Sequence, residues 1–285
     1  MGRVIELRSG DIERVTALLF GRQVVALTGA GISTDSGIPD YRGPASPPRK
    51  PMMYADFVSG PGAQRRYWAR AQVGWRHLAY AQPNAGHSAL VALERAGVVS
   101  GLITQNVDGL HTRAGSRTVI DLHGRITDVV CLSCPARTSR SEVHRRLTEL
   151  NPGQADRDGL TAPDGDALLD TTDVDGFQLA HCSRCGGVLK PDIVFFGENV
   201  PPERVDVCKS WVEAADVLLV AGSSLHVMSG FRFVRQAYRA GIPVVIINRG
   251  PTRGNPLATL KLDAGCSATL TGLADELCPS LQERR

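Results

Sequence analysis

The 285-residue sequence contains no long hydrophobic run, and this lack excludes one class of protein at once. A helix that crosses a bilayer needs about 20 consecutive apolar residues. The longest apolar candidates, residues 24–32 and 216–225, contain glycine or hydroxyl residues near their ends and have only the length of strands. We therefore expect a protein without membrane-spanning helices.

An excess of charge of one sign is also missing from the sequence. The net charge is +3, from 32 basic and 29 acidic residues that are interspersed. So small an imbalance does not indicate a nucleic acid or a membrane surface as partner. The N-terminal residues lack the apolar stretch of a signal peptide, and Glu6 and Asp11 argue against a transit peptide. These features predict a cytoplasmic protein.

Cysteine is present in an odd number, seven, and four of these residues form two Cys-x-x-Cys pairs. A chain of this length can bury a core without disulfides, so the pairs favour a metal. Four thiolates make a closed tetrahedral site for structural zinc. The 47 residues between the pairs exceed the usual spacing, but the entropy of loop closure rises slowly with length. We predict one zinc ion on Cys131, Cys134, Cys182 and Cys185, with His181 as a competing ligand.

Apolar segments of strand length alternate with helical segments, a pattern typical of an α/β protein with a doubly wound, parallel, Rossmann-like sheet. The stretch that contains both cysteine pairs interrupts this rhythm with polar turns, so we expect a small zinc-binding module inserted there. The predicted Rossmann-like domain comprises residues 1–127 and 188–285, with a helical insert at about 52–82, and the zinc module comprises 128–187. Strands are expected at 23–29, 98–106, 118–124, 192–197, 216–222 and 243–248.

A glycine-containing turn, "TGAGIST", follows the first expected strand. Glycines there let a backbone approach phosphate groups at a helix N-terminus. Gly29 and Gly31 fit a dinucleotide fingerprint, but Thr34 occupies the third glycine position and Asp40 comes too early for a dehydrogenase. The turn alone therefore fits either a nucleotide-binding loop or an ordinary connection between strand and helix.

Polar side chains also follow the next two expected strands, and ligands bind at such strand ends in open α/β sheets. Gln105, Asn106 and Asp108 could hold a ribose or a carboxamide, or could form a solvated Asx-turn. His123 has three possible roles: a base for a hydroxyl, a ligand of the metal held by the nearby cysteines, or a packed side chain. The turns "AGSSL" (221–225) and "INRG" (247–250) end two further strands.

Together these motifs resemble those of the sirtuins, the NAD-dependent protein deacylases, from about Gly21 to Leu273. "GAGISTDSGIPDYRG" is similar to the NAD-binding loop of the family, "TQNVDGLH" to its ribose and nicotinamide segment, and "DLHG" to its catalytic-histidine motif. "KPDIVFFGE" resembles its substrate strand. "RRYWARAQVGW", "PDGD" and "GPTRGNPLATLKL" resemble the class II branch, that of mitochondrial sirtuin 4. Ser229, in "HVMSGF", departs from the Val-x-Pro that many sirtuins carry there.

The resemblance implies a reaction in which NAD is consumed. The acyl-lysine oxygen attacks the ribose carbon that bears nicotinamide, and the products are nicotinamide, free lysine and O-acyl-ADP-ribose. His123 would be the base, Asn106 would hold the ribose or a water, and Asp108 the carboxamide. Cys266 would contact the adenine side, unless it is only a buried thiol. The other implied NAD-binding residues are Gly29, Ala30, Gly31, Ser33, Asp40, Tyr41, Arg42, Gln105, Val107, Gly222, Ser223, Ser224, Asn248, Arg249 and Gly250.

The substrate side follows from the same resemblance. Phe196, Gly197 and Glu198 would flank an acyl-lysine peptide bound as an added strand. Tyr67 and Arg70, one helical turn apart, would hold the carboxylate of an acidic or branched acyl group, or else are a core tyrosine beside a surface arginine. Two other functions stay open: a protein mono-ADP-ribosyltransferase, and a NAD-sensing binding module with little turnover.

Overall fold

The computed structural model describes residues 9–41, 51–157, 159–161, 164–168, 174 and 176–278. Six parallel strands form the main sheet, in the order β11-β10-β9-β1-β2-β3. The chain leaves the central strand β1 toward β2 and β3 on one side, and later returns to add β9, β10 and β11 on the other. The strands are β1 (Val24–Thr28), β2 (Val99–Thr104), β3 (Val119–Asp121), β9 (Val217–Ala221), β10 (Val244–Ile247) and β11 (Leu260–Leu262).

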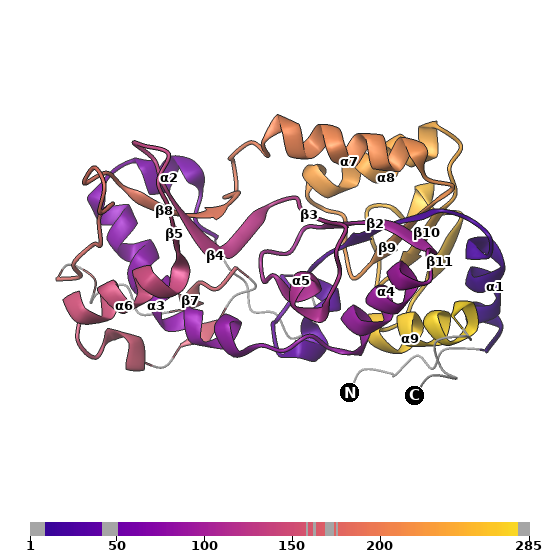
Figure 1. Ribbon diagram of the computed structural model, residues 1–285, viewed down its shortest axis with the longest axis horizontal. Coiled ribbons are helices and arrows are strands. Elements are labelled where there is room, and N and C mark those ends of the chain that lie inside the picture. Colours follow the sequence, from indigo (N-terminus) through magenta and orange to yellow (C-terminus); the bar gives the residue numbers. More distant parts are fainter. Residues whose placement is uncertain are drawn as a thin grey trace.

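Helices cover both faces of this sheet, and each strand therefore buries the side chains on both of its sides. In β1, Val24 and Ala26 pack toward the helices of one face, while Val25 and Leu27 pack toward the other. This explains why the strands appear in the sequence as continuous apolar runs. Figure 1 shows α7 (Pro202–Ala214) and α8 (Met228–Arg239) on one face, and α1 (Ser9–Leu19), α4 (Ala85–Arg95) and α9 (Cys266–Leu277) on the other.

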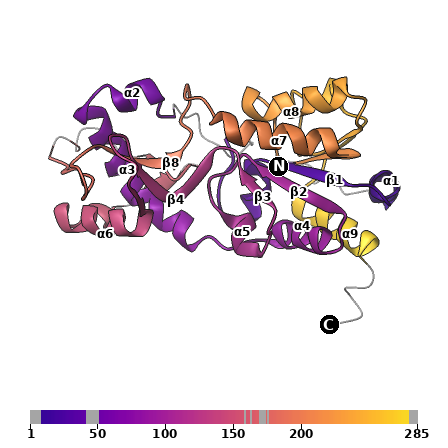
Figure 2. The same cartoon turned by 45° about the horizontal axis from the view of Figure 1, so that its top comes forward.

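A smaller unit lies beside the main sheet and contains the four paired cysteines (Figures 1 and 2). Its antiparallel sheet has the order β5-β4-β8, and Trp68 of the longest helix, α3, donates a hydrogen bond to the β8 backbone. Its elements are α2 (Tyr54–Val58), α3 (Pro61–Tyr80), β4 (Gly124–Cys131), β5 (Arg137–Ser139), α6 (Arg140–Leu150), β6 (Leu160–Thr161), β7 (Ala167–Leu168) and β8 (Leu189–Ile193). The short helix α5 (Leu110–Ala114) lies between β2 and β3.

The predicted fold class is confirmed: a parallel Rossmann-like sheet accompanies a small antiparallel unit with a cysteine cluster. The strand expected at 192–197 was wrong in its position and its partner, because β8 ends at Ile193 and pairs antiparallel with β4. Beyond that point Phe195 packs among aromatic rings, and Phe196 forms a single bridge to Met53, so the chain leaves the sheet. The division into domains at 127/128 and 187/188 stays a prediction.

Membrane association by a spanning helix was not expected from the sequence. Among the described residues, no helix combines the length and the apolar character that a crossing requires. The longest one, α3, has 20 residues and includes arginine, glutamine and histidine side chains.

Candidate functional site

A cavity of about 740 Å³ opens at the carboxyl ends of the parallel strands. The loops that follow β1, β2, β3, β9 and β10 all contribute to its lining. It lies where the chain turns from β1 to opposite sides of the sheet, which is where open α/β sheets bind their ligands. Its volume suits a ligand of the size of a cofactor or a drug. The cavity is therefore the candidate binding site.

Two glycine-containing loops approach each other closely at the floor of the cavity. The Gly31 amide donates a 2.8 Å hydrogen bond to the Gly222 carbonyl. A Cβ atom on Gly222 would lie 2.3 Å from the backbone nitrogen of Ile32, and Gly222 has a φ of +66°. A Cβ atom on Gly29 would lie 2.8 Å from the Gly222 oxygen. The turns after β1 and β9 thus require glycine for their mutual packing.

A connected hydrogen-bond network holds the polar side chains that follow β2. Ser33 donates to the Oδ2 atom of Asp108 at 2.7 Å, and Asn106 donates its amide to the Ser33 oxygen at 3.0 Å. The other carboxylate oxygen of Asp108 accepts from the Leu110 backbone at 2.9 Å. Ser33, Asn106 and Asp108 are all buried. These side chains are therefore fixed in place by the protein before any ligand binds.

His123 follows β3 and is bonded through both ring nitrogens. Its Nδ1 atom lies 2.8 Å from the Gln105 carbonyl oxygen, and its Nε2 atom lies 2.7 Å from the Ser229 hydroxyl. A carbonyl oxygen only accepts, so Nδ1 carries the proton in the neutral ring and Nε2 has the lone pair. Burial lowers the pKa of His123 to about 4. The hydrogen bond to the Gln105 carbonyl raises this pKa, and the positive charges of Arg204 and Arg232 lower it further. The imidazole is therefore neutral near pH 7 and able to accept a proton.

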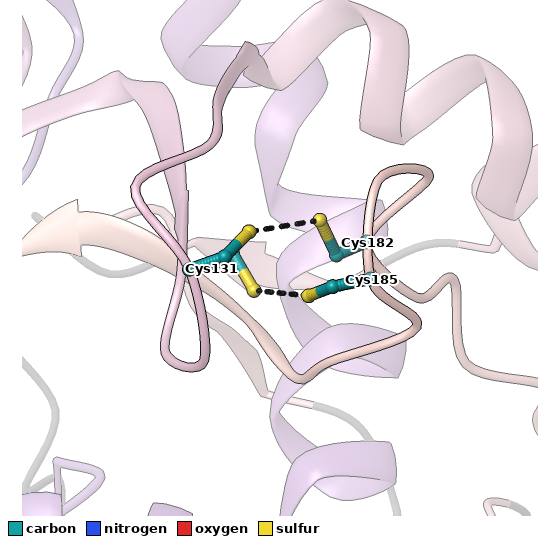
Figure 3. A group of neighbouring side chains, drawn as sticks. Cys131, Cys182 and Cys185 are labelled. Carbon is teal, nitrogen blue, oxygen red and sulfur yellow. Dashed lines mark hydrogen bonds between the residues drawn. The ribbon is translucent and has the colours of Figure 1, made fainter.

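The four paired cysteines lie together in the small unit, away from this cavity. Their sulfur atoms all lie within 4.8 Å of one another, with Cys131 and Cys185 3.5 Å apart and Cys134 and Cys182 3.8 Å apart. Figure 3 shows the labelled thiols pointing toward one another from the end of β4 and from the segment before β8. A tetrahedral ion with bonds of about 2.3 Å would separate its sulfur ligands by about 3.8 Å. The cluster therefore fits structural zinc, as predicted.

The position of His123 decides between its metal-binding and its cavity-facing roles. β4 begins at Gly124 and ends at Cys131, and an extended strand of that length separates His123 from the first thiol by about 25 Å. Among the described residues, the group that could hold a metal comprises the four cysteines and includes neither His123 nor His181. His123 instead lines the cavity. A role of His123 as metal ligand is thus excluded, and His181 is not a competing ligand.

Most residues that were expected to bind NAD or substrate meet in this one cavity. They come from six loops that are distant in the sequence, which supports the common edge of the sheet as the site. The predicted residues that line it are Gly29, Ala30, Gly31, Ser33, Asp40, Tyr41, Gln105, Asn106, Val107, Asp108, His123, Phe196, Gly197, Glu198, Gly222, Ser223, Ser224, Asn248, Arg249 and Gly250.

Four predicted residues are not placed in the lining. Arg42 lies outside the described residues. Cys266 is buried, its thiol lies 3.8 Å from the Ile247 carbonyl oxygen, and burial raises its pKa to about 12, which is the behaviour of a packed thiol. Tyr67 is buried in an aromatic cluster with Phe57 and Phe195. Arg70, the fourth, binds both carboxylate oxygens of Asp166 at 2.8 Å.

Several residues of the site were not predicted. Ser229 bonds to His123, and Arg232 follows one helical turn later on α8. Lys190, which is almost fully buried, binds Glu198 of the lining with a 3.0 Å contact. Asp164, in the loop between β6 and β7, also lines the cavity. The only signal for Ser229 in the sequence was its departure from the expected proline, and a lysine inside an apolar strand was a signal for Lys190.

Comparisons with known proteins agree with this geometry. A model of the Sir2 family matches residues 29–229. NAD-dependent protein deacetylase 1 of Mycobacterium avium (strain 104) is 57% identical over 270 residues, which cover 93% of this chain and 95% of that protein. The mitochondrial NAD-dependent protein lipoamidase sirtuin-4 of Bos taurus is 48% identical, covering 91% of this chain and 85% of that protein.

Solved structures show the same likeness in three dimensions. A structure described as Sir2 with a p53 peptide and NAD⁺ superposes with a TM-score of 0.74 at 31% identity, covering 95% of this chain and 99% of that one. A second, from work on the mechanism and regulation of Sir2 enzymes, gives a TM-score of 0.75 at 28% identity, with coverage of 98% and 100%. The resemblance seen in the motifs is confirmed, and the chain belongs to the Sir2 family, the sirtuins.

Proposed function

We propose that this sirtuin is an NAD-dependent protein lysine deacylase, which transfers the acyl group of an acyl-lysine to the ADP-ribose part of NAD. One observation carries this proposal: a neutral, doubly anchored histidine faces a cavity whose floor consists of two closely packed glycine turns. A binding module does not need a base at that position. Relatives that are named as NAD-dependent protein deacetylases support the same conclusion.

The chain's own residues define how the substrates would be held. The Gly31 and Gly222 turns line the cavity, where their backbone would approach the diphosphate of NAD. Asn106 and Asp108, fixed by Ser33, would orient the ribose and the carboxamide. His123 would then remove a proton from a ribose hydroxyl, which attacks the acyl carbon. No residue of the cysteine cluster takes part in these steps, so zinc would act only on the stability of the small unit.

The acyl-lysine peptide would bind as an added strand beside the loop after β8. The Phe196 backbone already contacts the start of α2, where the Tyr54 amide donates to its carbonyl at 2.9 Å and Met53 forms an isolated bridge with it. Glu198 accepts a 2.8 Å hydrogen bond from the Phe195 amide, which holds this loop in a turn. Phe196, Gly197 and Glu198 therefore present a formed edge to a peptide.

The preference among acyl groups depends on Arg70. Its guanidinium is paired through two bonds with Asp166, and the Tyr67 ring next to it is buried. An acyl carboxylate could therefore reach the guanidinium either by displacing Asp166 or by binding Nη1, which takes part in neither of these two bonds. Substrates with a neutral acyl group need no such contact. The predicted preference for acidic or branched acyl groups thus requires Arg70 to bind a carboxylate beside Asp166 or in its place.

The experiment is a panel of acetyl-, lipoyl- and glutaryl-type peptides incubated with NAD and read by mass spectrometry. We expect O-acyl-ADP-ribose and free lysine, with loss of both products in His123→Ala. His77→Ala, which changes an exposed histidine of α3, is the matched control. If glutaryl peptides turn over best, Arg70 contacts the acyl carboxylate, and Arg70→Ala should then remove that preference.

Other outcomes of the same assay would overturn the proposal. Transfer of labelled ADP-ribose to protein, without O-acyl-ADP-ribose, would favour the mono-ADP-ribosyltransferase. NAD binding without turnover of any peptide would favour a NAD-sensing module. A cytoplasmic location and the absence of membrane and nucleic-acid partners stay predictions, which cell fractionation and binding assays would test.

A further inference from the structure

The hydroxyl of Ser229 occupies the only lone pair with which His123 could accept a proton. Nδ1 of the neutral ring donates to the Gln105 carbonyl, so Nε2 is the accepting nitrogen. The Ser229 oxygen lies 2.7 Å from Nε2, and the serine must donate its proton in that bond. A substrate hydroxyl therefore cannot bind the same nitrogen directly while this bond exists.

The position of Ser229 is fixed by the same contacts that fix the other side of the ring. Ser229 is the second residue of α8, and Gly230 follows it. A Cβ atom on Gly230 would lie 2.3 Å from the side-chain oxygen of Gln105, so only glycine lets α8 approach Gln105 this closely. Gln105 is itself held by its amide, which donates to Ser223 at 2.8 Å and to the Thr28 carbonyl at 3.2 Å. Gln105, which bonds Nδ1, and helix α8, which carries Ser229, thus pack directly against each other.

Ser229 also faces the place where the substrate would be. It lines the cavity together with His123 and Arg232, and only a small part of it is exposed. A hydroxyl that donates one proton keeps two lone pairs, so Ser229 can accept from a substrate hydroxyl while it donates to Nε2. The chain has serine where many sirtuins carry a proline, a residue with no hydroxyl to offer.

We propose that Ser229 is a catalytic proton relay between the ribose hydroxyl of the bound substrate and His123. The ribose O–H bond breaks as its proton moves to the Ser229 oxygen, and the serine proton moves at the same time to Nε2 of His123. The ribose oxygen is left with the electron pair that forms its bond to the acyl carbon. The step consumes no reagent beyond NAD and the acyl-lysine. It rests on the proposed function, in which His123 is the base.

The test compares Ser229→Ala, Ser229→Thr, His123→Ala and the double variant Ser229→Ala/His123→Ala. Two rates are measured: formation of O-acyl-ADP-ribose, and exchange of labelled nicotinamide into NAD, which precedes the proton transfer. We expect Ser229→Ala to slow product formation about ten- to hundredfold, part of what a general base contributes, because a water can partly replace the hydroxyl. Nicotinamide exchange should keep its rate, and Ser229→Thr should restore product formation.

Two further results separate a relay from a merely structural role. The double variant should be no slower than His123→Ala, because two residues of one proton path are not additive. In mixtures of light and heavy water, the native rate should depend quadratically on the deuterium fraction, because two protons move in one step. The rate of Ser229→Ala should depend on that fraction linearly. Ser210→Ala, an exposed serine on α7, is the control, and thermal melting of each variant checks folding.

The possible failures are distinguishable. If Ser229→Ala forms product at the native rate or faster, the ribose hydroxyl displaces serine and binds Nε2 itself, and the relay is refuted. If Ser229→Ala loses both nicotinamide exchange and product formation, Ser229 is a binding residue and the relay is refuted. The relay is also refuted if the rate losses of Ser229→Ala and His123→Ala multiply in the double variant. If His123→Ala keeps full product formation, the assignment of His123 as the base fails, and the relay fails with it, while the deacylase reaction stands. If the native protein forms no O-acyl-ADP-ribose from any peptide, the proposed function itself is refuted.

Discussion

The buried lysine of β8 provides the sharpest test of how this fold supports the loop at 195–198, which lines the cavity. Lys190 is only 4% exposed, and its ammonium group contacts the Ile193 carbonyl and the Glu198 carboxylate, the latter at 3.0 Å. It also lies 4.8 Å from the centre of the Phe195 ring. These partners, at the end of β8 and in the loop after it, all line the cavity. Lys190→Met keeps an unbranched side chain that is one atom shorter and removes the charge.

The expected loss of stability follows from what the substitution leaves behind. Removing one partner of a buried ion pair destabilises a protein by about 3–5 kcal/mol, since the other charge stays without compensation. The Glu198 side chain is 23% exposed and also accepts from the Phe195 amide, so part of its charge stays solvated or bonded. We therefore expect the lower end, about 3 kcal/mol, which corresponds to a fall of about 6 °C or more in melting temperature.

The matched control is Lys209→Met on α7. Lys209 pairs with Asp206 at 2.9 Å, but their side chains are 49% and 68% exposed, and such pairs contribute about 0–1 kcal/mol. Thermal melting and the KM for an acyl-lysine peptide are measured for both variants. We expect Lys190→Met alone to melt lower and to raise the peptide KM. Equal melting temperatures with an unchanged KM would refute the role assigned to Lys190.

Three further predictions concern the glycine turn, the metal and acid stability. Gly222→Ala should weaken NAD binding about tenfold by titration calorimetry, whereas Gly241→Ala, equally left-handed but with open space around it, should not. Chelation or Cys131→Ala should release zinc, measured by emission spectroscopy, and lower the melting temperature, whereas Cys208→Ala should keep the metal. Burial holds the pKa of His111 well below 6.5, so His111 is protonated in the unfolded chain at a higher pH than in the folded one. The free energy of unfolding should therefore decrease as the pH falls below 6.5, and His111→Gln should reduce this decrease.

The parts of this molecule that could be predicted from the sequence are those governed by local chemistry. Residues 24–27 are apolar without interruption because helices cover both faces of the sheet. A glycine turn or a polar cluster after such a strand must lie at the carboxyl edge, and parallel strands bring all these edges together. The order of motifs and strands therefore predicted that Gly29, Asn106 and His123 lie at one edge of the sheet, and the family resemblance gave them a common site. The two Cys-x-x-Cys pairs could likewise be recognised as metal ligands from their short spacing alone.

What escaped prediction depends on partners that are distant in the chain. Arg70 and Asp166 are 96 residues apart, and nothing in a helical periodicity states that the second neutralises the first. The strand expected at 192–197 failed for a similar reason: Phe195 has the residue type of a strand, but its ring packs between α2 and α3. Composition indicates that a side chain will be buried, and only the fold determines which element buries it.

His123 shows how far the nearest neighbours in a sequence can mislead. Cys131 and Cys134 follow it closely and suggest a shared metal, yet β4 is extended and carries the thiols away from the sheet edge. The residues that bind the imidazole come from 18 positions earlier and 106 positions later in the chain. The later one, Ser229, stands where the motif departs from the pattern of many sirtuins. At this histidine the departure from the motif was therefore a better guide to a bonded partner than proximity along the chain, since proline has no side-chain hydroxyl that could bind Nε2.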